Sequence, residues 1–118
     1  MSDLTVSHTF GNDGQILVTI GGRLAIDTVA GFRAFLTEQL PQAATVKLDA
    51  ASLEEIDLCG IQLICSACHT ALCAGKMFAF SGGIPACVQT TISSLGLQGY
   101  DVCKYNSDIT CIWCRGVN

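Results

Sequence analysis

The sequence predicts one α/β domain across residues 1–118, with a mixed sheet that begins in an N-terminal hairpin and has helices packed against it. Two strand-like runs flank a turn made of residues that tolerate positive φ, which indicates the hairpin. Beyond it, helix-like and strand-like runs alternate, and such connections are right-handed crossovers between parallel strands. Half of the residues are apolar, which is enough for a single hydrophobic core.

The hairpin is expected to pair residues 4–10 with residues 15–20. Between these runs, residues 11–14 read Gly-Asn-Asp-Gly, a composition typical of tight turns. Four of the six residues in the second run are apolar, as in a largely buried strand. Gly21 and Gly22 are expected to break this strand.

A first helix is expected from Asp27 to about Leu40, with Asp27 as its N-cap. Its apolar residues recur at helical spacing and share one face; they are Val29, Phe32, Leu36 and Leu40. Pro41 ends the helix because proline has no N–H to donate and disfavours helical geometry in the preceding residue. A short strand is expected at residues 45–49.

A second helix begins at the N-cap Asp57 and ends at a Gly-Lys pair, which suits a helix C-terminus. Its apolar stripe comprises Ile61, Ile64, Cys65, Cys68 and Leu72. A strand is expected at residues 77–80, and Pro85 suits the first turn of a third helix. This third helix is expected to end at Gly96 and to turn Val88, Ile92 and Leu95 inward. A final strand is expected at residues 109–113.

The composition excludes several classes of partner and location. A net charge of −4 leaves no basic face for phosphates, so no nucleic-acid partner is expected. The N-terminal residues lack the charged and apolar regions of a signal peptide, and no apolar run reaches the roughly 18 residues that span a membrane. The expected location is therefore cytoplasmic, where the eight cysteines would be reduced and would mostly pack as small apolar residues.

Residues 57–64 resemble the Asp-Ser-Ser-Gly-Leu signature of the STAS domain, a family named for sulfate transporters and anti-sigma factor antagonists. Residues 46–49 resemble the strand before that signature. Residues 22–24 resemble the family's Gly-x-Leu after its second strand, and residues 95–97 its Gly-Leu after the third helix. The similarity runs in order over roughly residues 4–100, and the family's fold agrees with the order of elements above.

The resemblance implies a non-enzymatic regulatory module of bacterial signal transduction that docks a protein. In anti-sigma factor antagonists the second serine of the signature is phosphorylated, which blocks docking. Cys59 stands at that position and Leu58 at the first serine, so the serine phosphoswitch is expected to be absent unless Ser52 or Ser66 replaces it. The expected docking residues are Arg23, Ser52, Asp57, Leu58, Cys59, Gly60 and Gln62.

The expected partner is a signalling protein: a kinase, an anti-sigma factor, or a component of chemotaxis or two-component histidine-kinase regulation. An alternative partner is the ATPase of an ABC lipid-transport system, to which the chain would be an accessory STAS subunit. Neither the partner's identity nor the oligomeric state follows from the sequence.

A second alternative is a thiol redox sensor centred on Cys59. A thiol in the first turn of a helix gains from the positive helix end, but the acidic residues Glu54, Glu55 and Asp57 oppose its ionisation. A reactive cysteine needs an electropositive setting, so this role is the weaker hypothesis.

No enzyme, metal or cofactor site is expected. Two Cys-x-x-Cys pairs occur at residues 65–68 and 111–114, but the first lies on a helical stripe and the second on a strand, where its cysteines would face opposite sides. Gly82 and Gly83 precede a helix without the Gly-Lys-Ser/Thr of a phosphate-binding loop, which leaves nucleotide binding open but unsupported. No Ser-His-Asp order or acid–base pair is present.

Overall fold

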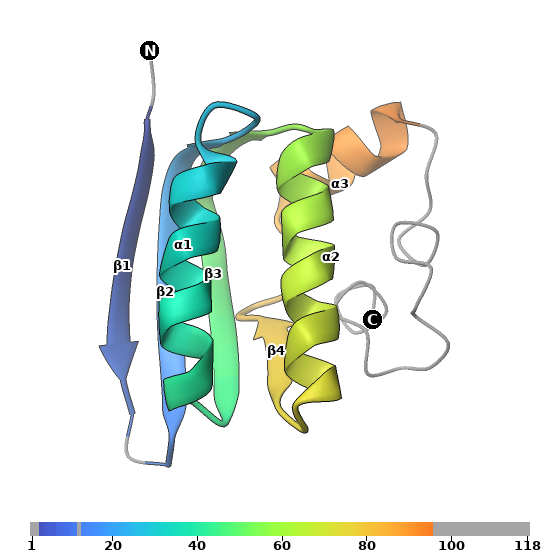
Figure 1. Ribbon diagram of the computed structural model, residues 1–118. Helices are drawn as coiled ribbons and strands as arrows, with labels where there is room; N and C mark the ends of the chain where they lie inside the picture. The colour runs from blue at the N-terminus through green and yellow to red at the C-terminus, as the bar shows by residue number, and fades with distance from the viewer. Residues whose placement is uncertain (1–2, 12, 96–118) are drawn as a thin grey trace.

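The computed structural model describes residues 3–11 and 13–95, and Figure 1 shows its arrangement. The elements in chain order are β1 (Leu4–Phe10), β2 (Gln15–Leu24), α1 (Val29–Gln39), a 3-10 turn (Leu40–Gln42), β3 (Thr45–Ile56), α2 (Leu58–Cys73), β4 (Met77–Phe80) and α3 (Ala86–Ser94). The strand predicted at residues 109–113 and the helix end predicted at Gly96 lie outside the described residues.

The sheet has the order β1-β2-β3-β4, and its hairpin is the antiparallel pair β1 and β2. β3 pairs in parallel with both β2 and β4. α1 and α2 lie side by side over one face of the sheet, and α3 lies near the end of β3 (Figure 1). The predicted fold class is confirmed: a mixed sheet with an N-terminal hairpin and helices packed against it.

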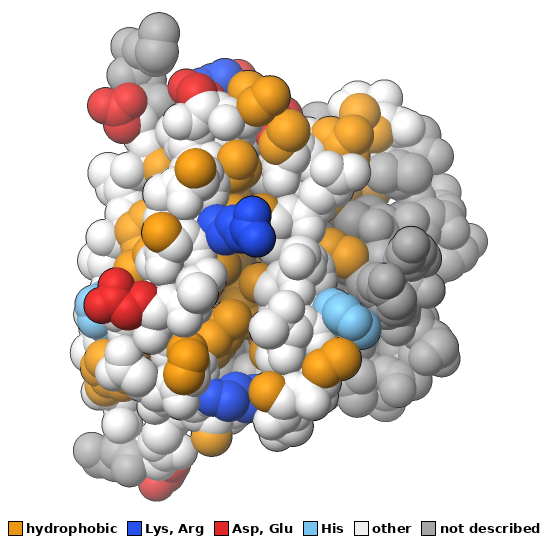
Figure 2. Space-filling view, in the orientation of Figure 1, with side chains coloured by type: hydrophobic (Ala, Val, Ile, Leu, Met, Phe, Trp, Pro, Cys, Tyr) orange, Lys and Arg blue, Asp and Glu red, His pale blue; other side chains and the backbone are white. Residues whose placement is uncertain are grey.

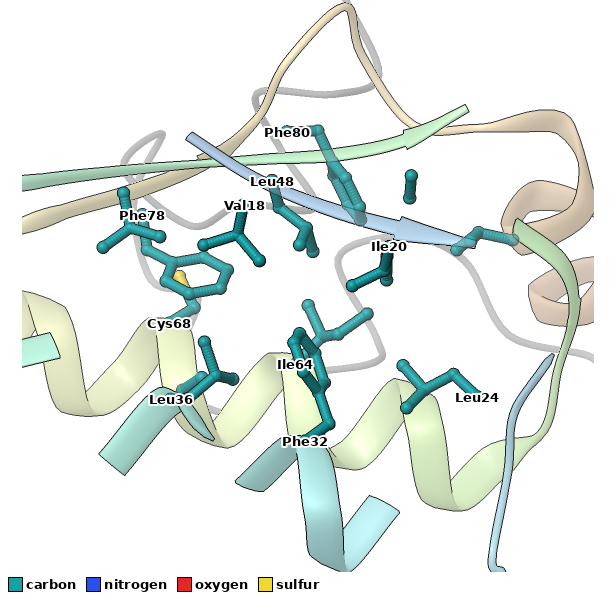
Figure 3. Close-up of a cluster of buried hydrophobic side chains, with 14 of the residues drawn as sticks. Val18, Ile20, Leu24, Phe32, Leu36, Leu48, Ile64, Cys68, Phe78 and Phe80 are labelled. Atoms are coloured by element: carbon teal, nitrogen blue, oxygen red, sulfur yellow. The ribbon is translucent and has the colours of Figure 1, made fainter. Parts of the chain in front are cut away.

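The core fills the layer between the sheet and the pair α1 and α2 (Figure 3). Alternate residues of β2 and β3 point toward the helices, as the two-residue period of a strand requires. The labelled core residues are Val18, Ile20, Leu24, Phe32, Leu36, Leu48, Ile64, Cys68, Phe78 and Phe80, all of them buried. Of the residues predicted on the two apolar helix faces, five are buried: Phe32, Leu36, Ile61, Ile64 and Cys68. The other four are only partly buried: Val29, Leu40, Cys65 and Leu72. Gly60, Ala67 and Ala71 are also buried, although the predicted stripe did not include them.

The predicted strand break at Gly21 and Gly22 is wrong, because β2 continues through both to Leu24. Gly21 pairs with β1 on one side and with Ser52 of β3 on the other. Gly22 has φ +86°, and a side chain there would meet the Asp3 carbonyl oxygen at 2.0 Å. The two glycines therefore let the neighbouring strands approach closely, and pairing on both sides keeps them within β2.

β3 is also longer than predicted and extends from Thr45 to Ile56. Its second half contains Ser52, Glu54 and Glu55, but it pairs with the extended β2, from Gly21 opposite Ser52 to Leu24 opposite Ile56. Register shifts interrupt the pairing twice, as at β-bulges. Long-range pairing thus overrides a sequence that reads locally as a loop.

Two smaller predictions about helices are corrected. The N-cap of α1 is Thr28 rather than Asp27, and its hydroxyl accepts from Ala25 N at 2.9 Å and donates to Arg23 O at 2.9 Å. Leu95, predicted to face inward, is 44 % exposed just after the last residue of α3. Val88 and Ile92 are buried as predicted.

Gly60 is the position where α2 is most tightly seated on the sheet. An added Cβ would lie 2.6 Å from the Leu24 carbonyl oxygen and 2.7 Å from Cγ1 of Ile56. Gly31 occupies the matching position in α1, because each glycine is the third residue of its helix. A Cβ added to Gly31 would meet nothing within 4 Å.

Gly60→Ala is expected to destabilise the protein by about 1–3 kcal/mol, since the clash outweighs the gain in helix propensity. Gly31→Ala, the matched control, is expected to be neutral or to stabilise by up to about 1 kcal/mol. Urea unfolding of the two variants measures both effects. Equal stabilities of the two variants would contradict the close packing at Gly60.

Candidate functional site

The start of α2 is joined to the loop between β2 and α1 by one carboxylate. Asp57 Oδ1 accepts a hydrogen bond from Gly60 N at 3.0 Å, which caps the helix as predicted. Asp57 Oδ2 accepts a second bond, from Ile26 N at 3.0 Å. The backbone N–H of Asp57 in turn donates to Leu24 O at 3.2 Å. Asp57 therefore holds the start of α2 and the loop between β2 and α1 in one arrangement.

A group of charged residues lies beside this junction. Arg23 Nε donates to Glu55 Oε2 at 2.5 Å, and Arg23 Nη1 pairs with Asp27. The hydrogen bond that Arg23 donates to Glu55, followed by the one that it donates to Asp27, raises the pKa of the Arg23 guanidinium above its ordinary value. Arg23 is a permanent cation set between two exposed carboxylates, which gives the site a polar rim.

Two large apolar side chains are exposed next to this rim. Leu58, the first residue of α2, is 42 % exposed, and Ile26 in the β2–α1 loop is 70 % exposed. Figure 2 shows hydrophobic side chains beside acidic and basic ones at the end of the molecule where β2 and β3 end. Sequence reasoning found Leu58 but missed Ile26, although an apolar residue between Ala25 and Asp27 in a loop is a detectable signal.

The structure brings most of the predicted docking residues together at this end of the sheet. Arg23, Asp57, Leu58 and Cys59 lie at or beside the junction, and Gln62 is exposed one turn further along α2. Gly60 is buried, so it contributes by seating the helix. Ser52 is exposed but sits inside β3, three residues before Glu55 or roughly 10 Å along the strand. It lies away from the junction.

A groove between α1 and α2 adjoins the start of α2, and the sequence did not predict it. It has a volume of about 890 Å³, and Figure 2 shows hydrophobic side chains along it with a basic side chain within it. Its lining residues are Val29, Ala30, Arg33, Ala34, Thr37, Glu38, Cys59, Gln62, Leu63 and Ser66. Cys59 and Gln62, two of the predicted docking residues, therefore also line this groove.

Among the residues described, no group of three His, Cys, Asp or Glu side chains is arranged to hold a metal ion. Cys68 of the first Cys-x-x-Cys pair is buried in the core, and residues 111–114 lie outside the described part. Burial raises the pKa of the Cys87 thiol, which donates to Leu53 O at 3.3 Å. None of the described helices has the length and apolar character needed to cross a membrane.

A family model described as "Mlab, STAS domain" matches residues 8–104. The chain belongs to the STAS domain family. No protein of curated function matches the sequence.

Solved STAS structures share this fold at low identity. An anti-sigma factor antagonist from Mycobacterium paratuberculosis superposes with a TM-score of 0.65 at 15 % identity, covering 80 % of this chain and 79 % of that one. Unphosphorylated SpoIIAA, a Bacillus anti-sigma factor antagonist, gives 0.61 at 13 % identity over 79 % and 84 %. SLC26A9 gives 0.60 at 21 % identity, over 70 % of this chain but 16 % of that one. These similarities show the STAS fold.

Asp57→Ala is expected to lower the free energy of unfolding by about 1–2 kcal/mol, because the helix loses its cap and the loop its anchor. Asp27→Ala is the matched control: it removes a carboxylate that forms only an exposed ion pair, so the expected loss is about 0.5 kcal/mol or less. Urea denaturation of both variants measures the difference. Equal losses would show that Asp57 does not anchor the site.

Proposed function

We propose that the chain is a non-enzymatic docking module that binds a regulatory protein through the surface around the start of α2. The observation that carries this proposal is the pair of exposed apolar side chains, Leu58 and Ile26, held beside a charged rim by Asp57. The docking surface comprises Arg23, Ile26, Asp27, Glu55, Asp57, Leu58, Cys59 and Gln62.

The arrangement has the composition of a protein interface. Protein interfaces combine an apolar centre that loses its water with a polar rim that stays solvated. Here Leu58 and Ile26 supply the centre, and Arg23 with its carboxylates supplies the rim. The two bonds to Asp57 order the loop before any partner arrives, which lowers the entropy cost of binding.

The partner that we propose is an anti-sigma factor. Two of the similar structures are anti-sigma factor antagonists, which favours this partner over a chemotaxis or histidine-kinase component. The family is one of regulatory interaction domains, in agreement with a role without catalysis. The net negative charge of the chain favours a partner with a basic or apolar contact surface.

Docking is proposed to lack the serine phosphoswitch at position 59. Cys59 is the second residue of α2 and lines the groove next to the docking surface. A serine kinase transfers phosphate to a hydroxyl, so this thiol is no substrate. Ser66 in the groove and Ser52 on β3 are exposed hydroxyls, but neither lies in the first turn of α2.

A second candidate is the accessory STAS subunit of an ABC lipid-transport system. The matching family model is described as "Mlab, STAS domain" and its description does not name anti-sigma factor antagonists, which supports this alternative. The same surface would then contact an ATPase. The two candidates share the docking surface and differ in the protein bound to it.

The proposed surface is tested with Leu58→Asp, which places a charge at its apolar centre. Tagged wild type and variants are used to capture partners from the source cell's lysate, and affinity is then measured with the purified partner. Leu58→Asp is expected to weaken binding at least about tenfold. Leu17→Asp is the matched control, because Leu17 is 36 % exposed in the middle of β2, and it should bind as wild type does.

An anti-sigma factor that binds wild type but not Leu58→Asp supports the first candidate, and an ABC ATPase with the same behaviour supports the second. If Leu58→Asp and Leu17→Asp bind the captured partner equally well, the docking surface is misplaced.

The effect of charge at position 59 is tested separately. Cys59→Glu imitates a phosphate and adds charge beside Asp57, so it is expected to weaken partner binding at least about tenfold. Cys59→Ser keeps the size of the side chain and should bind as wild type does. Intact-mass measurement after incubation with the cognate kinase checks the switch: phosphate on the wild-type chain would contradict its proposed absence.

A further inference from the structure

The last turn of α2 holds a cysteine and a histidine in contact. Cys73 is the last residue of the helix and is exposed, and His69 lies four residues earlier on the same face. The Cys73 sulfur lies 3.6 Å from Nε2 and 4.0 Å from Nδ1 of His69. A thiol with an imidazole in hydrogen-bonding reach is the arrangement of a nucleophile with its base.

The other cysteines among the described residues are all less exposed than Cys73. Cys87 is half-buried, donates to the Leu53 carbonyl oxygen, and has a raised pKa, all of which favour the neutral thiol. Cys68 is buried in the core. Cys59 is only partly exposed. Cys73 is exposed and has a base beside it.

His69 lies where it can accept the proton of the Cys73 thiol, because its ring nitrogens are within hydrogen-bonding reach of the sulfur. Transfer of the thiol proton to His69 leaves the thiolate in contact with the resulting imidazolium, the kind of positive neighbour that activates cysteines. The nearby cation Lys76 is engaged elsewhere, because its ammonium donates to the Leu40 carbonyl oxygen at 2.5 Å.

We propose that Cys73, with His69 as its base, is a peroxide-reactive modification site. His69 takes the thiol proton, and the thiolate attacks one oxygen of the peroxide. The S–O bond forms as the O–O bond breaks, and the departing hydroxide takes the proton from the imidazolium to leave as water. Sulfur loses two electrons to become a sulfenic acid, and the peroxide is reduced.

This site is separate from the docking surface. Leu58 and Cys73 are the first and last residues of α2, which places them about 22 Å apart along the helix. The thiol that responds to oxidant is thus Cys73 and not Cys59, and its reaction can be measured without any partner protein.

The experiment treats the reduced full chain with hydrogen peroxide in the presence of dimedone, which traps sulfenic acids. Digestion and tandem mass spectrometry then follow the adduct on each of the eight cysteines with time. Cys73 is expected to acquire the adduct first, and Cys73→Ser to remove it. His69→Gln is expected to slow the labelling of Cys73 at least about tenfold. This effect is smaller than the ~10²-fold rate contribution that is typical of a general base held in an active site. His8→Gln, on β1, is the matched control and should leave the rate unchanged.

Faster labelling of any other cysteine would overturn the assignment of the site. Equal rates for wild type and His69→Gln would overturn the role of His69. Far-ultraviolet circular dichroism of each variant confirms that a change in rate does not come from unfolding.

Discussion

The carboxylate of Asp57 is the constraint on which the proposed docking surface depends. One of its oxygens caps α2 and the other holds the loop after β2, so two segments far apart in sequence share one anchor. Because the loop carries Ile26 and the helix carries Leu58, this anchor also places the two exposed apolar side chains. Arg23 and its two carboxylate partners lie beside these apolar side chains. The carboxylate that caps α2 therefore also determines where the two exposed apolar side chains lie.

The second constraint is the close approach of neighbouring backbone segments at two glycines. Gly22 and Gly60 both stand where a side chain would meet a carbonyl oxygen, one against the start of β1 and the other against the end of β2. These positions explain why the STAS pattern contains glycine there. Gly60 also sets how closely the start of α2 approaches the end of β2, and hence how far Leu58 and Cys59 project.

Much of the fold could be predicted from periodicity and breaking residues. The helices, the hairpin and the core residues follow from patterns contained within single segments. The failures have a common cause in contacts between segments. Gly21 and Gly22 look like a strand break until two neighbouring strands pair with them, and the second half of β3 looks like a loop until β2 extends beside it. Asp27 is an acceptable cap by sequence, but Arg23 engages it and Thr28 takes the capping position.

The candidate site also contains residues that the sequence predicted and residues that it did not. The run from Asp57 to Gln62 is continuous in sequence and was predicted, whereas Ile26 joins it only through a long-range hydrogen bond. The groove between α1 and α2 needs both helices in place, so Arg33 carried no signal on its own. Ser52 was included because of its place in the family pattern, but it lies inside a strand away from the junction.

Backbone hydrogen–deuterium exchange of the chain with and without its purified partner tests the central claim most directly. The account predicts added protection in residues 23–28 and 55–62, with little change in the first halves of β2 and β3. Protection confined to the sheet around Leu17 and Lys47, with none at the start of α2, would contradict it.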